Sequence, residues 1–100
     1  MQITGLWDVE MHYIRGAANH TLYIEEKGGQ VMGQHRGEFL SGDIRGSRTG
    51  DRISLRSSHR YEGTAVTYRF DGTIAAKEIT GTVDLAEYGK ARFTAKRRWA

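Results

Sequence analysis

The chain contains neither cysteine nor proline. Without cysteine it has no disulfide bonds and no thiolate chemistry, so the redox state of its compartment stays open. Without proline no residue interrupts a hydrogen-bonded ladder, which suits long β-strands. The apolar runs are far shorter than the roughly 18 residues of a membrane-spanning helix, and no signal segment opens the chain. We therefore expect no membrane partner, and the missing signal segment favours the cytoplasm.

A large excess of charge of one sign is also missing. The formal net charge is only +3, from 15 basic and 12 acidic residues. A length of 100 residues with 38% hydrophobic residues is ordinary for a folded domain with one modest core. We expect a single domain that spans residues 1–100.

One basic run near the C-terminus could suggest nucleic-acid binding. It consists of Lys90, Arg92, Lys96 and Arg98, which share one parity of the last alternating segment. If the first and last strands pair, Asp8 and Glu10 would lie opposite Arg98 and Lys96 and neutralise them through cross-strand ion pairs. No exposed aromatic series accompanies the run for base stacking. We expect no nucleic-acid partner.

Alternation of apolar and polar residues with a period of two dominates the sequence, and no segment of ten or more has a helical period. Short turns separate the alternating segments, such as Gly28-Gly29 and Thr49-Gly50-Asp51. The segments lie near residues 7–13, 22–24, 31–35, 44–48, 53–59, 64–74, 79–85 and 91–99. This pattern predicts an all-β fold, an eight-stranded antiparallel up-and-down barrel whose closure removes exposed edges.

The turn after the sixth segment has two candidate positions. Asp71-Gly72 is a strong hairpin signal, but a turn there would place Ile74 and Ile79 on opposite faces. A turn at Ala76-Lys77 keeps both isoleucines inside, with Gly72 as a bend within the strand. We favour the later turn.

An aliphatic-x-glycine step recurs three times, as Val31-Met32-Gly33, Ile44-Arg45-Gly46 and Ile79-Thr80-Gly81. Each glycine falls on the inward parity. A narrow barrel needs small residues at such positions, both to bend and to avoid an overfilled interior. The repeat is interpreted as a packing device without a chemical role.

Trp7 in a Gly5-Leu6-Trp7 segment and Arg97 on the last strand resemble the closure of calycins, the group of lipocalins, fatty-acid-binding proteins and avidins. In that group a Gly-x-Trp on the first strand packs under an arginine of the last strand. The resemblance implies a calycin-like, lipocalin-like barrel plugged at one end by Trp7 and Arg97.

A closer resemblance spans nearly the whole chain. Gly5 to Asp8 and the Phe93-Thr94-Ala95-Lys96-Arg97 strand are similar to a C-terminal accessory domain of bacterial amidohydrolases and of selenocysteine-synthase-like pyridoxal-phosphate enzymes. The catalytic residues of those enzymes lie in other domains, so none is assigned here. The resemblance implies a non-catalytic accessory or interaction domain, either excised from a larger bacterial enzyme or standing alone, with a neighbouring catalytic domain as partner. No cofactor is implied.

The inward parity also places polar residues near the end of the barrel opposite Trp7. The candidate ligand-binding rim consists of Tyr13, His20, His35, His59, Thr64 and Tyr88, with Ser57 nearby. Three imidazoles at one rim could contact a polar or anionic ligand or a metal, although their spacing matches no metal motif and no metal is assigned. The alternative is a polar, partly solvated barrel end. Since eight strands enclose either a packed core or one small ligand, a small-molecule-binding protein is the alternative function.

Overall fold

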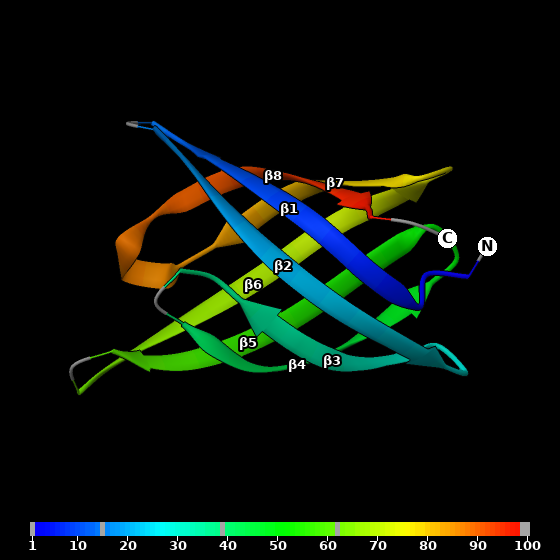
Figure 1. Ribbon diagram of the computed structural model, residues 1–100, viewed down its shortest axis with the longest axis horizontal. Helices are drawn as coiled ribbons and strands as arrows, with labels where there is room; N and C mark the ends of the chain where they lie inside the picture. The colour runs from blue at the N-terminus through cyan, green and yellow to red at the C-terminus, as the bar shows by residue number, and fades with distance from the viewer. Residues whose placement is uncertain (1, 15, 39, 62, 99–100) are drawn as a thin grey trace.

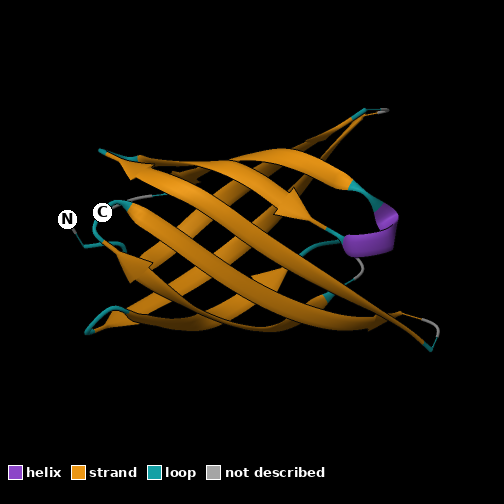
Figure 2. Cartoon of the chain, turned by 180° about the vertical axis from the view of Figure 1, so that it is seen from behind, coloured by secondary structure: helices purple, strands orange, loops and turns teal. Residues whose placement is uncertain are grey.

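The computed structural model describes residues 2–14, 16–38, 40–61 and 63–98. It confirms the predicted architecture, since eight antiparallel strands follow one another around a closed up-and-down barrel (Figures 1 and 2). The strands are β1 (Gly5–Tyr13), β2 (Gly16–Lys27), β3 (Gln30–Arg36), β4 (Ser41–Thr49), β5 (Arg52–Tyr61), β6 (Thr64–Ala75), β7 (Glu78–Asp84) and β8 (Lys90–Arg97). A single-turn 3-10 helix, η1 (Ala86–Tyr88), joins the last two strands.

The barrel closes where β1 pairs with β8. Trp7 lies directly opposite Arg97 in this ladder, and Met11 lies opposite Phe93. This pairing confirms the predicted seam and leaves no free edge in the described sheet, so the barrel avoids the pairing hazard of an open strand.

The later of the two candidate turns is confirmed. Ile74 pairs with Ile79 and Gly72 with Gly81, so β6 runs through Asp71-Gly72 and turns at Ala76-Lys77. The hydrophobic pattern therefore decided the register against the local turn signal, because a slip by one residue would turn the strand inside out.

Inward-facing side chains fill the barrel. The buried apolar residues form one cluster that extends from Ile3 and Trp7 through Met11 and Phe93 to Tyr68. Burial along β1 alternates strictly from Trp7 onward, as the period-two pattern predicts. The interior is thus a packed core, supplied by all eight strands.

The three repeated glycines are confirmed as packing devices, for a more specific reason than the one expected. A Cβ atom on Gly33, Gly46 or Gly81 would overlap the carbonyl oxygen of the neighbouring strand, at Tyr23, Ser54 and Asp71 respectively. At each of these glycines the side-chain position points at the backbone of the adjacent strand. Any larger residue would force two strands apart.

The two ends of the barrel differ. At one, the closed end, lie both described ends of the chain and the turns after β2, β4 and β6 (right in Figure 1). At the other, the mouth, lie the connections after β1, β3 and β5 together with η1 (left in Figure 1). None of the described helical structure has the length and apolar character of a membrane-spanning helix.

Candidate functional site

The mouth brings together the three histidines that the sequence placed there. His20 on β2, His35 on β3 and His59 on β5 all face inward, because each occupies the parity of the core residues on its strand. His35 is fully buried and His59 is 7% exposed, whereas His20 is half-buried. The predicted convergence of these side chains is therefore confirmed.

The three imidazoles form one chain of hydrogen bonds. His20 Nδ1 lies 2.7 Å from His35 Nε2, and His35 Nδ1 lies 3.0 Å from His59 Nε2. The buried hydroxyl of Ser57 completes a triangle with these last two nitrogens, at 2.9 Å from His35 Nδ1 and 3.1 Å from His59 Nε2. Both ring nitrogens of His35 are thus engaged within the protein.

One placement of the protons suits this geometry. If His59 Nε2–H donates toward His35 Nδ1, then His35 Nε2–H donates to His20 Nδ1, and the Ser57 hydroxyl bridges the first pair. His59 Nδ1 is buried without a hydrogen-bond partner among the described residues, and this placement leaves it unprotonated. The reverse placement would leave a buried N–H unpaired there, which proteins avoid more strictly than an unpaired acceptor. The chain of donors therefore runs outward, toward His20.

Burial favours the neutral form of His35 and of His20. It lowers the pKa of His35 to about 3, with further lowering by the imidazoles of His20 and His59. Burial and repulsion by His59 lower the pKa of His20 as well. The expected depression of at least one histidine follows from the cost of placing a charge in a poorly solvated, crowded cluster.

Aromatic rings line the histidine cluster. Tyr68 makes edge contacts with His35 and His59, at ring-centroid distances of 4.9 and 5.6 Å. The hydroxyl of Tyr13, which is half-buried, reaches the Met11 sulfur at 3.4 Å. Burial raises the pKa of both tyrosines. Tyr68 was not among the predicted rim residues, although its inward parity on β6 was a signal that it faces the cluster.

One member of the predicted rim, Tyr88, does not join the cluster. Tyr88 lies on η1 and is 55% exposed, with no ring contact to the described histidines. The sequence could not foresee this because the 3-10 turn carries the side chain outward. Thr64 begins β6, but its side chain lies outside the described residues.

The cluster is arranged for hydrogen bonding and not for metal binding. No group of three or more histidine, cysteine or carboxylate side chains in the described part of the chain is placed to hold a metal ion. The nitrogens face each other at hydrogen-bond distances, and a zinc ion would have to enter between them at about 2.0–2.1 Å from each. What the arrangement offers is a donor or acceptor at His20, the partly exposed end of the chain.

At the closed end, the predicted contact between Trp7 and Arg97 is confirmed. The guanidinium carbon of Arg97 lies 5.0 Å from the centroid of the buried indole. The indole N–H donates to the carbonyl oxygen of Ile3 at 2.9 Å, and Arg97 donates to the carbonyl oxygen of Gln2. The N-terminal segment thus covers Trp7 and completes the plug.

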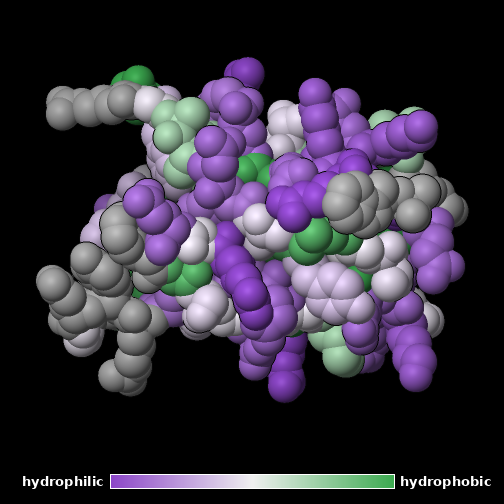
Figure 3. Space-filling view, viewed as in Figure 1, coloured by the Kyte–Doolittle hydropathy of each residue, from purple (hydrophilic) through white to green (hydrophobic). Residues whose placement is uncertain are grey.

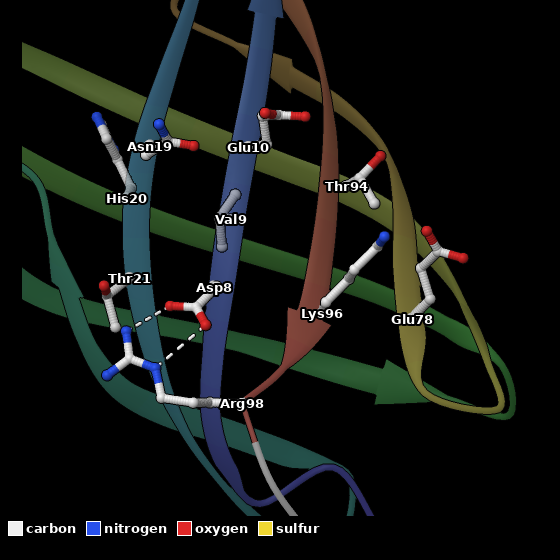
Figure 4. Close-up of a pocket in the computed structure, with 10 residues that line it drawn as sticks. All are labelled: Asp8, Val9, Glu10, Asn19, His20, Thr21, Glu78, Thr94, Lys96 and Arg98. Carbon is white, nitrogen blue, oxygen red and sulfur yellow. Dashed lines mark hydrogen bonds and ion pairs between the residues drawn. The ribbon is translucent and has the colours of Figure 1, made fainter.

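A polar groove follows the outer surface of the closing seam (Figure 4), on a face that is largely hydrophilic (Figure 3). Within it Arg98 binds Asp8 through two hydrogen bonds, which confirms the predicted ion pair, although Lys96 and not Arg98 lies opposite Asp8 in the ladder. The predicted partnership of Glu10 with Lys96 is wrong. The ladder places Lys96 opposite Asp8 and Thr94 opposite Glu10, and Glu10 contacts His12 at 2.8 Å instead.

Three arginines on another part of the surface escaped the sequence analysis. Arg45 on β4 lies directly opposite Arg56 on β5, which in turn lies directly opposite Arg69 on β6. All three are exposed. Their shared outward parity was visible in the sequence, but their alignment required the register of two hairpins. We refer to these three residues as the arginine row.

Comparisons with protein-family models, with curated proteins and with solved structures give no match for this chain.

Proposed function

We propose that this chain is a non-catalytic accessory domain, a calycin-like barrel that acts through contacts with other molecules. The carrying observation is the packed interior, in which apolar side chains run as one cluster from Ile3 to Tyr68. A barrel filled in this way leaves its outer surface and its mouth as the regions for interaction.

The Trp7–Arg97 contact supports the calycin-like assignment. The resemblance to accessory domains of bacterial amidohydrolases and pyridoxal-phosphate enzymes supports a neighbouring catalytic domain as the partner. The histidine cluster does not favour catalysis by Ser57. This serine is only 1% exposed, and its hydroxyl is hydrogen-bonded to His35 and His59, which are buried as well. A nucleophile must reach its substrate.

Thermal unfolding with added ligands tests this proposal. A ligand that binds only the folded protein raises its melting temperature. Palmitate, haem and zinc are added separately, and none is expected to raise the melting temperature. A rise with palmitate or haem that increases with ligand concentration would show an interior able to open, and would contradict a filled barrel.

A second candidate function is the binding of a small polar molecule at the mouth. The specific observation is His20, which is half-buried and ends the outward chain of donors from His59. With Nδ1 accepting from His35, the neutral His20 ring carries its N–H on Nε2. An acceptor group, such as a carboxylate, could accept a hydrogen bond from this N–H. Histidine NMR titration with acetate is the test, using His20→Ala and, as matched control, His12→Ala on the outer surface of β1. Shifts at His35 that vanish only in His20→Ala would support this function.

A further inference from the structure

We propose that the arginine row binds a compact ligand that carries two or more phosphate groups. Three exposed arginines occupy directly opposed positions on adjacent strands, at Arg45, Arg56 and Arg69. Since neighbouring strands lie about 4.8 Å apart, the row extends for about 10 Å across the barrel wall. This is a binding site on the outer surface, and it does not depend on what the interior or the mouth binds.

The row is not accounted for by internal ion pairs. Among the described residues, none of its three members lies within 4.0 Å of a carboxylate. Asp84 is directly opposite Arg69 in the ladder, yet its carboxylate accepts the backbone N–H of Ala86 at 2.8 Å. Asp43, close to Arg45 on β4, accepts from Gln34 at 2.7 Å. Like charges directly opposite one another destabilise a sheet, so the row lowers the free energy of unfolding when nothing is bound.

A shallow groove gives the row the shape of a site. It lies over β5 and β6 and is lined there by Arg56, Arg69, Ser58 and Thr67. Asp84 and Ala86 line its far side, so a bound anion would lie toward the two arginines. The two hydroxyls lie 3.2 Å apart, beside the two guanidinium groups. Arginine forks donate pairs of parallel hydrogen bonds to phosphate oxygens, and hydroxyls add further donors. Arg45 continues the line of donors beyond the groove, where a second phosphate group would lie.

The surroundings limit the ligand to a compact one. Asp43 lies two residues before Arg45 on β4, and Asp71 lies two residues after Arg69 on β6, both with the same outward parity. On β7, Asp84 lies opposite Arg69, at one end of the row. These carboxylates would repel a long polyanion that continued past the row. A small oligophosphate fits between them, whereas a nucleic-acid backbone or a sheet of anionic lipid headgroups would meet their negative charge.

Isothermal titration of the protein with tripolyphosphate tests the proposal, with inorganic phosphate as the single-group comparison. We expect tripolyphosphate to bind at least tenfold more tightly than phosphate. The variant Arg45→Gln/Arg56→Gln/Arg69→Gln is expected to lose at least tenfold in affinity. The matched control Arg36→Gln/Arg52→Gln/Arg92→Gln removes the same charge from scattered outward positions and is expected to keep the wild-type affinity. Circular dichroism checks that both variants fold.

Three outcomes would overturn the proposal. The first is no binding of tripolyphosphate by the wild-type protein. The second is an equal loss of affinity in the two variants, which would indicate attraction by net charge alone. The third is tighter binding of a single-stranded oligonucleotide or of vesicles containing phosphatidylserine, abolished by the same three substitutions, which would assign the row to an extended polyanion. Each is independent of the melting experiments on the interior.

Discussion

The two ends of this barrel are filled by different kinds of side chain. At the closed end a buried indole is covered by Ile3 and Arg97, and its N–H has a partner, although Arg97 Nε is buried without one among the described residues. At the mouth the corresponding space holds three imidazoles and a hydroxyl, and one buried ring nitrogen of His59 has no partner among the described residues. The first arrangement stabilises the fold, whereas the second adds buried polar groups that stabilise it less. A function is therefore expected at the mouth or on the outer surface, and not at the closed end.

Removal of the plug is expected to have the largest effect. Trp7→Ala deletes a fully buried ring that contacts the N-terminal segment and Arg97. We expect a loss of about 3–5 kcal/mol in the free energy of unfolding, measured by urea denaturation. His20→Ala at the half-buried edge of the mouth is the comparison, with an expected loss of less than about 1 kcal/mol. Equal losses would show that the two ends contribute equally to the stability of the fold.

Acid is expected to act on the mouth and spare the closed end. The folded protein holds the pKa of His35 at about 3, whereas the unfolded chain has the ordinary value near 6.5. Between these values the unfolded state binds more protons, so stability is full above about pH 6.5 and falls as the pH falls. At pH 5 this one group should cost about 2 kcal/mol.

Urea denaturation from pH 7.5 to pH 5 measures this dependence. His35→Gln should reduce the slope, since glutamine does not titrate, and leave the smaller part that comes from the lowered pKa of His20. His12→Gln, which removes an exposed histidine of β1, should leave the slope unchanged. An undiminished slope in His35→Gln would mean that His35 is not responsible.

At the closing seam, two neighbouring arginines test whether the contact with Trp7 stabilises the fold. Arg97→Ala removes the cation–π contact with Trp7, worth about 0.5–2 kcal/mol, and the hydrogen bond to the carbonyl oxygen of Gln2. Arg98→Ala removes an ion pair with Asp8 that is exposed to solvent and screened by it. We expect the melting temperature to fall more for Arg97→Ala. A larger fall for Arg98→Ala would contradict the plug.

The sequence predicted the fold because strand parity is a local property. Alternation put Trp7, His35 and Ile74 on the inside, and the turn at Ala76-Lys77 followed from the same rule. Contacts that depend on the exact register of two strands were harder to predict from the sequence. Glu10 was assigned to Lys96 because a shift of two residues along β8 leaves parity unchanged, and only the observed ladder separates the two alternatives. The arginine row was missed for the same reason.

The smallest expected effect concerns the arginine row without its ligand. Arg56 has an arginine directly opposite it on both sides, so Arg56→Gln relieves two repulsive cross-strand contacts. We expect a gain of about 0.2–1 kcal/mol in the free energy of unfolding at low ionic strength. Salt screens exposed charges, so the gain should shrink toward zero in about 1 M sodium chloride. Arg52→Gln, a control that faces Thr49 and Thr73 across the ladders, should show neither the gain nor the salt dependence. A loss of stability in Arg56→Gln would mean that the carboxylates around the row already compensate its charge, and the reason to expect a bound anion there would disappear.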